Sequence, residues 1–353
     1  MNITRRHSRQ VDVGGVKIGG DAPVVLQSMT NTDTRDIEAT VRQIKALTAA
    51  GCDLVRVAVP DQDSARAFGE IREKAGVPLI ADIHFDYRLA LKAIENGADK
   101  IRINPGNIGS FDRVKKILEA AAGKGIPIRI GVNAGSLEKR LREEKGVSGE
   151  SLLESALNQV HAIEKEGFYD IVIASKASSA LDTIEVNRLL ASETDYPLHL
   201  GLTEAGLPGA GSIKSAVTIG ALLAEGIGDT IRVSLSGDPL YEIRDGLIML
   251  RALGLKPPGL DIISCPTCAR CHGEVAEVAA ELQEKLDKIA FPLKVAVMGC
   301  EVNGPGEARE ADVGVAFTKK GGALIFRKGE IVGRTDNALD SLLNEIANIS
   351  VED

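Results

Sequence analysis

The sequence contains no tryptophan, and its other aromatics are scarce, with 4 Tyr and 7 Phe among 353 residues. Nucleic-acid-binding surfaces need aromatic platforms for bases and a basic patch for phosphates. The chain as a whole instead has a net charge of -8 at pH 7. We therefore expect no nucleic-acid partner, and any anion-binding site has to be local.

Long apolar runs are also missing. No stretch approaches the ~20 apolar residues that a transmembrane helix needs. The amino-terminal segment MNITRRHSRQ lacks the apolar core of a signal peptide. We therefore expect a cytoplasmic protein with no membrane partner. Hydrophobic residues make up 44% and charged residues 26% of the chain, which is typical of a globular protein.

Cysteine is sparse as well, with five in the chain. An odd number, clustered late in an intracellular chain, suggests metal ligands more than a disulfide framework. Cys265, Cys268 and Cys271 form the spacing CxxCxxC, and Cys300 follows in VMGCEVNGPGE. Cys52 stands alone at the start of an apolar run, and we expect it to be a small core residue.

The spacing of the cysteines does not by itself identify a metal. Thiolates bind both zinc and iron-sulfur clusters. Zinc ribbons normally have two CxxC pairs, whereas three close cysteines and a remote one are nearer to ferredoxin spacing. An iron-sulfur cluster is favoured, with zinc and free thiols as open alternatives. Glu307, across the turn NGPG from Cys300, is a possible oxygen ligand, and Cys271 and His272 have no assigned role.

Short apolar runs alternate with longer amphipathic stretches from residue 23 to about residue 255. Strands that alternate with helices pair in parallel, and eight such units fit a TIM barrel better than a doubly wound sheet. No GxGxxG follows the first run, which counts against a dinucleotide-binding unit. The eight runs are PVVLQS, DLVRVAV, VPLIADIHF, DKIRINPG, IPIRIGVN, YDIVIASK, YPLHLGLTE and DTIRVSLSG.

The linker KPPG, residues 256–259, interrupts this rhythm. We expect residues 1–259 to form the barrel and residues 260–353 to form a small α/β domain. Within the second part, LKVAVMG and DVGVAF predict strands, and ALIFRKGEIVGRT predicts a hairpin that turns at Lys328 and Gly329. Ahead of the barrel, VDVGGVKIGG predicts a short hairpin that closes the bottom of the barrel.

Polar residues alternate with apolar ones inside several predicted barrel strands. In IRIN, IRIGVN and IRVS, the isoleucines and valines lie on one face, while Arg102, Arg129 and Arg232 lie on the other. If the apolar face packs under the helices, the arginines point into the barrel at the carboxyl ends of the strands, where TIM barrels keep their active sites. Arg56 and Lys176 have equivalent positions, so we expect five cations at one mouth. The other polar residues expected there are Asp82, His84, Asn104, Asn133, Thr203, Glu204 and Ser234.

Five buried cations need an anion. Burying one unpaired cation costs several kcal/mol. Asp82 and Glu204 can neutralise two of them, which leaves about three for a ligand. Arginine binds two phosphate oxygens at once, so the pattern predicts a phosphorylated or diphosphorylated small molecule. The alternative, in which each arginine pairs with a neighbouring carboxylate, is as good for a single arginine but much weaker for the whole set.

Two of these residues have a second interpretation. Lys176 could form a Schiff base, as in aldolases of this fold, but nothing in the sequence shows an apolar pocket that would lower its pKa. Anion binding is therefore favoured for it. Glu204 lies in the glycine-rich loop LTEAGLPGAG, which allows close approach to a ligand. It is a candidate proton donor, with a salt bridge to an arginine as a nearly equal alternative.

The chain resembles the bacterial 4-hydroxy-3-methylbut-2-enyl diphosphate synthases in SCPTC, VAVMGCEVNGPGEARE, IRINPGNIG, RIGVNAGSLE, HLGLTEAG and IRVSLSGDP. The resemblance runs in order along the whole chain. It implies a TIM barrel followed by a reductase-like iron-sulfur domain. It also implies a reaction of the non-mevalonate isoprenoid route, in which 2-C-methyl-D-erythritol 2,4-cyclodiphosphate takes two electrons from a flavodoxin or ferredoxin, opens its ring and loses water.

The resemblance also implies roles for single residues. It assigns the five cations and the other polar residues of the barrel mouth, including Glu204, to substrate binding; donation of a proton by Glu204 to the departing oxygen is our own hypothesis for this reaction. The resemblance further implies that one cluster ligand is the carboxylate of Glu307. An oxygen ligand bonds iron more weakly than a thiolate and leaves an iron available to substrate. The family usually has neither a cysteine nor a histidine at the positions of Cys271 and His272, which leaves Cys271 as an alternative to the carboxylate. The ligands of a [4Fe-4S] cluster fall on Cys265, Cys268, Cys300 and Glu307.

The family forms homodimers in which the cluster domain of one subunit covers the barrel of the other, and we expect the same here. Two other functions stay open from the residues themselves. One is a phosphosugar aldolase that uses Lys176, and the other is a non-catalytic binding protein stabilised by zinc.

Overall fold

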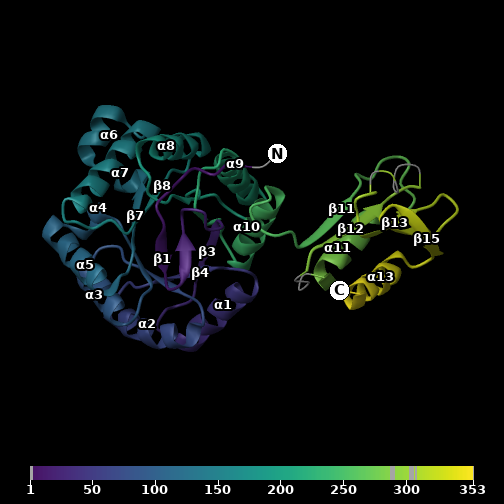
Figure 1. Cartoon of the computed structure of the whole chain (residues 1–353), viewed down its shortest axis with the longest axis horizontal. Coiled ribbons are helices and arrows are strands. Elements are labelled where there is room, and N and C mark those ends of the chain that lie inside the picture. Colours follow the sequence, from purple (N-terminus) through teal and green to yellow (C-terminus); the bar gives the residue numbers. More distant parts are fainter. Residues whose placement is uncertain (1–2, 287–290, 302–305, 307, 353) are drawn as a thin grey trace. The chain divides into compact units, whose positions relative to one another are not determined.

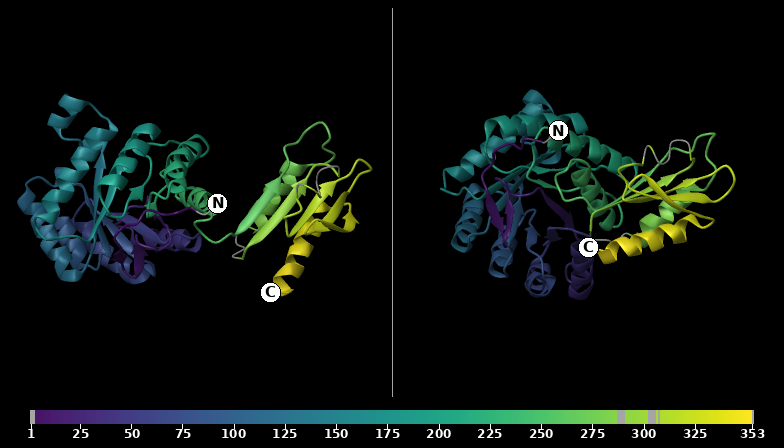
Figure 2. Two further views of the ribbon diagram at one scale, coloured as in Figure 1. Left: turned by 45° about the horizontal axis from the view of Figure 1, so that its top comes forward. Right: turned by 45° about the vertical axis from the view of Figure 1, so that its right-hand side comes forward.

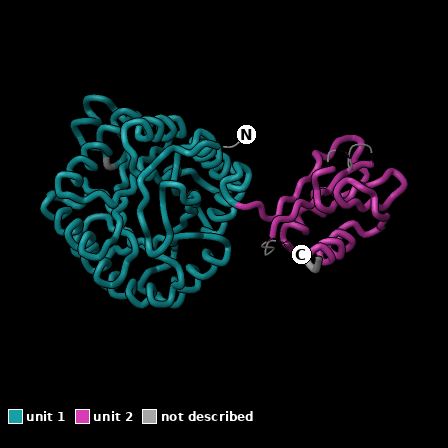
Figure 3. The backbone as a smooth tube through the Cα atoms, viewed as in Figure 1, with its two compact units in different colours: residues 1–256 teal, residues 257–353 magenta. Residues whose placement is uncertain are grey.

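The computed structural model describes residues 3–286, 291–301, 306 and 308–352. The chain folds as two compact units, residues 1–256 and residues 257–353 (Figure 3). The first unit ends three residues before the end expected from the linker. None of the helices in the described ranges is long and apolar enough to cross a membrane.

The first unit is a barrel of eight parallel strands (Figure 1). Neighbouring strands pair in the order β8-β7-β6-β5-β4-β3-β10-β9, and a bridge between Ile173 and Leu198 joins the two ends of this series. Each strand overlaps one of the eight predicted runs, so the TIM barrel is confirmed. The strands are β3 (Val25–Met29), β4 (Leu54–Ala58), β5 (Leu79–Asp82), β6 (Lys100–Ile103), β7 (Ile128–Asn133), β8 (Ile171–Lys176), β9 (His199–Leu200) and β10 (Thr230–Ile231).

Helices surround the barrel, as the two further views also show (Figure 2). Side chains fix several of their starts: the Asp61 carboxylate accepts a hydrogen bond from the backbone N–H of Ser64, and so begins α2. Gly76 then ends α2 in the left-handed conformation, with a φ of 68°. The helices are α1 (Ile37–Ala49), α2 (Gln62–Ala75), α3 (Tyr87–Glu95), α4 (Pro105–Ile108), α5 (Phe111–Lys124), η1 (Ala134–Ser136), α6 (Lys139–Lys145), α7 (Gly149–Glu164), α8 (Ala180–Glu193), α9 (Ala210–Ala224) and α10 (Leu240–Ala252).

The barrel strands have an apolar outer face that packs under the helices. Ile101 and Ile103 of β6 and Ile128 and Ile130 of β7 are fully buried in the main hydrophobic core. This core also contains helix residues such as Phe68, so the isoleucines pack under the helices as predicted. Because side chains alternate along a strand, the residues between them point into the barrel.

A short hairpin closes the amino-terminal end of the barrel. Strands β1 (Val11–Val13) and β2 (Val16–Ile18) pair antiparallel, and Val13 and Ile18 are fully buried. The hairpin packs against interior residues of four barrel strands, which confirms the predicted closure at the bottom. These residues are Val25, Leu54, Ile80 and Val172.

Within the described residues, the second unit has a five-stranded sheet and the helices α11 and α13. Its strands pair in the order β11-β12-β13-β14-β15; the first three are parallel and the last two pairings are antiparallel. Lys328 and Gly329, with φ values of 47° and 83°, form the predicted turn between β14 and β15. The elements are β11 (Leu260–Ser264), α11 (Val275–Leu286), β12 (Leu293–Met298), β13 (Val313–Phe317), β14 (Ala323–Arg327), β15 (Glu330–Thr335) and α13 (Ala338–Glu352).

Replacing Ile18 by alanine tests whether the hairpin closes the barrel. We expect the free energy of unfolding to fall by about 2–5 kcal/mol, because the change opens a cavity against the strand interior. Ile248, which is 58% exposed on α10, is the matched control, and its replacement should change stability by less than about 0.5 kcal/mol. Urea unfolding followed by circular dichroism measures both. Equal losses would contradict the buried role of the hairpin.

Candidate active site

The five predicted cations converge inside the barrel. Arg56 lies on β4, Arg102 on β6, Arg129 on β7, Lys176 at the end of β8 and Arg232 directly after β10. Burial lowers the pKa of Arg129 well below its ordinary value, and the charges of Arg56 and Arg102 lower it further. Burial also lowers the pKa of Lys176, and so do Arg129 and Arg232. The cations therefore lie close enough to repel one another.

A sixth cation lies on the same interior face. Lys100 precedes Arg102 by two residues on β6 and is fully buried. Burial holds the pKa of Lys100 well below its ordinary value, and the charges of Arg129 and Arg56 add to this effect. Lys100 was not among the predicted residues, although the alternation that places Arg102 in the interior places Lys100 there as well.

Asp82 is the carboxylate at the centre of one group. It accepts a hydrogen bond from Nη1 of Arg102 at 3.1 Å, lies 3.1 Å from Nε2 of His84, and lies 3.9 Å from Nε of Arg56. Burial alone would raise the pKa of Asp82, but the charge of Arg56 and the hydrogen bond with His84 hold it below its ordinary value. Asp82 therefore stays ionised and neutralises part of the cationic group, as predicted.

The second carboxylate is Glu242, not Glu204. Glu242 on α10 accepts hydrogen bonds from Nε and Nη2 of Arg232, both at 3.2 Å, and one from the Ser28 hydroxyl at 2.8 Å. Glu204 is exposed and forms no ion pair within the described residues. Its backbone φ of 57° turns the loop after β9 into the left-handed region, which a residue other than glycine rarely adopts. The expected neutralisation by Glu204 was therefore wrong.

Three cations have no carboxylate within ion-pair distance in the described part of the chain: Lys100, Arg129 and Lys176. Nζ of Lys100 and both Nε and Nη1 of Arg129 are buried without a hydrogen-bond partner among described residues. Buried donors in folded proteins are nearly always satisfied. Three of the six interior cations thus have no carboxylate partner among the described residues, and an anion would satisfy the buried donors.

The lowered pKa of Lys176 was not anticipated. Burial and the charges of four neighbouring arginines lower this pKa. Nothing in the sequence indicated an apolar pocket that would do so. Nζ of Lys176 lies 3.3 Å from Nε2 of His199, which is fully buried at the start of β9. Lys176 is therefore suited to binding an anion, because a nearby negative charge stabilises the ammonium form and offsets the neighbouring cations.

The remaining predicted residues lie around the same mouth. Asn104 is buried and begins α4 by accepting a hydrogen bond from the Gly106 N–H, while its Nδ2 has no partner among described residues. Asn133 ends β7, and the Thr203 N–H donates to the Ala177 carbonyl. Ser234 is half-buried two residues after Arg232, beyond the end of β10.

The cysteines of the second unit follow two paired strands. Cys265 comes directly after β11, and β12 lies beside it, with Ser264 opposite Val297. The backbone N–H of Gly299 donates to Sγ of Cys265 at 3.1 Å. A hydrogen bond from the Arg270 backbone lowers the pKa of Cys268. The lowered pKa of Cys268 favours its thiolate, which is the state in which cysteine binds a metal or an iron-sulfur cluster.

Cys271 has a different environment. Its Sγ donates to the Gly273 carbonyl at 3.1 Å, and a Cβ placed on Gly299 would meet this sulfur at 2.7 Å. The sulfur of Cys271 can occupy this position because residue 299 has no side chain. The predicted ligand Glu307 lies outside the described residues, and within the described ones no three His, Cys, Asp or Glu side chains form a group that could hold a metal ion.

Cys52 is a core residue, as predicted. It is 3% exposed, and burial raises the pKa of its thiol to about 12. This thiol is therefore unsuited to binding a metal.

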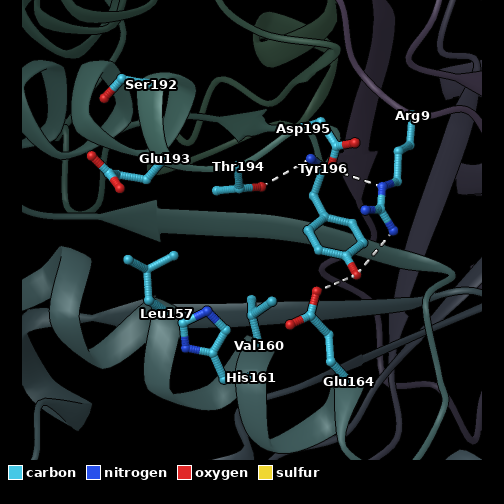
Figure 4. A pocket seen from close by; sticks show the side chains of 10 residues that line it. All are labelled: Arg9, Leu157, Val160, His161, Glu164, Ser192, Glu193, Thr194, Asp195 and Tyr196. Atoms are coloured by element: carbon cyan, nitrogen blue, oxygen red, sulfur yellow. Dashed lines mark hydrogen bonds and ion pairs between the residues drawn. The ribbon is translucent and has the colours of Figure 1, made fainter.

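A surface hollow of about 470 Å³ lies near the amino-terminal ends of the barrel strands, away from the predicted mouth (Figure 4). Arg9 stacks 4.5 Å from the centroid of the Tyr196 ring and pairs with Asp195 at 2.8 Å. The Tyr196 hydroxyl donates to Glu164 at 2.9 Å. Because these groups satisfy one another and precede β9, the hollow is separate from the cations at the carboxyl ends of the strands.

Two family descriptions match the chain. They are the GcpE TIM-barrel domain over residues 8–247 and the GcpE protein C-terminal domain over residues 261–348. The sequence is 56% identical over 352 residues to the 4-hydroxy-3-methylbut-2-en-1-yl diphosphate synthase (flavodoxin) of Caldanaerobacter subterraneus subsp. tengcongensis, with 99% of each chain covered. It is 53% identical over 348 residues to the protein of the same name from Geobacter sulfurreducens, with 98% of each covered.

Among solved structures, the barrel is similar to dihydropteroate synthase from Stenotrophomonas maltophilia. The TM-score is 0.52 at 17% identity, over 71% of this chain and 100% of the other. At this identity the similarity concerns the fold alone.

Replacing Arg129 by methionine tests the surplus of buried charge. Without ligand, we expect the free energy of unfolding to rise by about 1–4 kcal/mol, because an unpaired buried cation is removed. We also expect inorganic pyrophosphate to raise the melting temperature of the wild type, and to raise that of the variant less. Lys214→Met, at an exposed position of α9, should change stability by less than about 0.5 kcal/mol. A less stable variant, or an undiminished effect of pyrophosphate, would contradict the account.

Proposed function

The chain belongs to the GcpE family and acts as a flavodoxin-dependent 4-hydroxy-3-methylbut-2-en-1-yl diphosphate synthase; we propose that the cations of its barrel hold the diphosphate of the substrate. The reaction is the reductive ring opening and dehydration of 2-C-methyl-D-erythritol 2,4-cyclodiphosphate to (E)-4-hydroxy-3-methylbut-2-enyl diphosphate. The observation that carries the proposal is the set of buried donors without partners on Lys100 and Arg129.

The charge of the substrate supports this assignment. Each phosphorus of a cyclic diphosphate carries one ionised oxygen, so the ring is a dianion. Breaking the carbon–oxygen bond at one end frees a phosphate oxygen, and the negative charge increases. Cations that are already in place stabilise this developing charge more than the charge of the closed ring, which lowers the barrier for ring opening. Arg129 and Lys176, which have no carboxylate partner in the described part, are the groups best suited to this role.

We assign the ligands of a [4Fe-4S] cluster to Cys265, Cys268, Cys300 and Glu307. The lowered pKa of Cys268 supports a thiolate ligand there, and the hydrogen bond from the Gly299 N–H fixes the position of the Cys265 sulfur. The bond of the Cys271 thiol to the Gly273 carbonyl supports leaving Cys271 out of the set. Glu307 is included on the family resemblance, since it lies outside the described residues. When bound, the cluster would supply single electrons that it receives from flavodoxin.

Glu204 is the proposed proton donor to the departing oxygen. It is exposed, it has no ion pair in the described ranges, and its carboxyl group is therefore available to a ligand. Its left-handed backbone is the kind of local strain that persists at functional sites.

We further propose that the enzyme is a homodimer in which the cluster of one subunit serves the barrel of the other. The family resemblance supports this arrangement. In such a dimer each active site depends on residues of both chains, and two differently damaged chains can complement each other.

Anaerobic turnover of the cyclodiphosphate with an artificial reductant tests the function. The wild-type protein should form the diphosphate product, and Glu204→Gln should be slower by about 10²–10⁴-fold, as for loss of a general acid. The pair Cys300→Ser and Cys271→Ser is the matched control for the ligand set. The first should lose iron and activity, while the second should keep both. Unimpaired Glu204→Gln would remove the proposed role of this residue, and an inactive wild type would remove the function.

Co-expression of Cys300→Ser and Arg129→Ala chains tests the dimer. Half of the dimers formed are hybrids with one intact site, so we expect about a quarter of wild-type activity from two inactive variants. Co-expression of Cys300→Ser with Cys265→Ser should recover nothing, because both chains then lack the cluster. Absence of recovery in the first mixture would mean that each subunit uses its own cluster.

A further inference from the structure

The ammonium group of Lys176 is held in a defined place by two residues of β9 and the loop that follows. Nε2 of His199 lies 3.3 Å from Nζ of Lys176. Two residues later, a Cβ on Gly201 would collide with Nζ of Lys176 and would lie 2.7 Å from the Arg232 carbonyl oxygen. The absence of a side chain at Gly201 thus leaves the space in which Lys176 reaches His199.

The second nitrogen of His199 has its own partner. Nδ1 of His199 lies 3.4 Å from Oγ1 of Thr230 on the neighbouring strand β10. Nε2 of Gln27 on β3 donates to the same oxygen at 2.6 Å. His199, Thr230 and Gln27 are all buried, at 0–1% exposure. The chain of contacts therefore runs from Lys176 through the imidazole to two strands of the barrel wall.

The protonation of the imidazole follows from the charge of its partner. In its ammonium form Lys176 has three donors and no acceptor, so in that form Nε2 of His199 accepts from it. The imidazole proton is then on Nδ1 and points to the Thr230 hydroxyl oxygen. Burial holds the pKa of His199 well below its ordinary value, and the charges of Lys176, Arg129, Lys100 and Arg56 lower it further, which keeps the ring neutral.

We propose that His199 is a positioning residue for Lys176: as a neutral acceptor oriented by Thr230, it holds the lysine head where the substrate phosphate binds. The proposal rests on the proposed function, because it takes Lys176 as a ligand of the diphosphate. A lysine has a long flexible stem, and a head that is already fixed loses less freedom when the anion binds. No carboxylate in the described part pairs with Lys176, so His199 is its acceptor there until the substrate arrives.

The test is a double-mutant cycle on the full chain. Binding of the cyclodiphosphate is measured by calorimetry without reductant, so the result does not depend on turnover. Lys176→Met should weaken binding by about 10-fold to 100-fold, as for loss of a charge-assisted hydrogen bond. His199→Phe should weaken binding by about 10-fold in the wild-type background. In the Lys176→Met background, His199→Phe should change the affinity for the cyclodiphosphate by less than about threefold, because His199 acts on the ligand through Lys176.

Conservative variants separate positioning from packing. His199→Gln keeps an acceptor toward Lys176 and should bind within about threefold of the wild type. Thr230→Val removes the oxygen that orients the imidazole and should weaken binding, while Thr230→Ser should not. These variants also decide the matter if His199→Phe fails to fold.

The outcomes are distinct. Equal losses from His199→Phe in both backgrounds, or equal losses from His199→Gln and His199→Phe, would overturn the positioning role and leave a packing role. A wild-type chain that does not bind the cyclodiphosphate would instead overturn the proposed function.

Discussion

Positive charge buried in the barrel without matching carboxylates is the constraint on which the site depends. Six cationic side chains face the interior, and Asp82 and Glu242 are the carboxylates that pair with them in the described part. The apolar outer face of the same strands provides the core that tolerates this charge. Unpaired buried cations destabilise the barrel when no ligand is bound. Binding of a phosphate-bearing anion therefore stabilises the fold and places the substrate in the site at the same time.

Strand alternation explains why so much of this site could be predicted from the sequence. Once IRIN and IRIGVN are taken as strands with buried isoleucines, the direction of Arg102 and Arg129 follows. The same rule places Lys100 and His199 in the interior, and both were overlooked only because they lie deeper than the strand ends. Glu242 could not be predicted, because it lies on a helix and meets Arg232 only after the chain turns. The choice of Glu204 as a partner was wrong for a related reason, since a left-handed turn in its loop is not evident from residue types.

The cysteine segment shows where prediction from spacing ends. CxxCxxC suggests three equivalent ligands, but pairing of β11 with β12 gives Cys265 a hydrogen bond from Gly299, whereas the Cys271 thiol donates to a carbonyl. These environments differ because of the fold around them, not because of their spacing. The fourth ligand rests on family resemblance alone, and the function rests on the match of both units to one family.

The most direct test of the central claim compares two ligands of the isolated full-length chain. One is 2-C-methyl-D-erythritol 2,4-cyclodiphosphate, and the other is 2-C-methyl-D-erythritol, the same carbon skeleton without phosphate. If the surplus of buried cations is the binding determinant, calorimetry will detect binding of the cyclodiphosphate, weakening as salt is added, and no binding of the tetrol. Comparable affinity for both would contradict the account, because the site would then recognise the carbon skeleton and its hydroxyl groups in place of the charge.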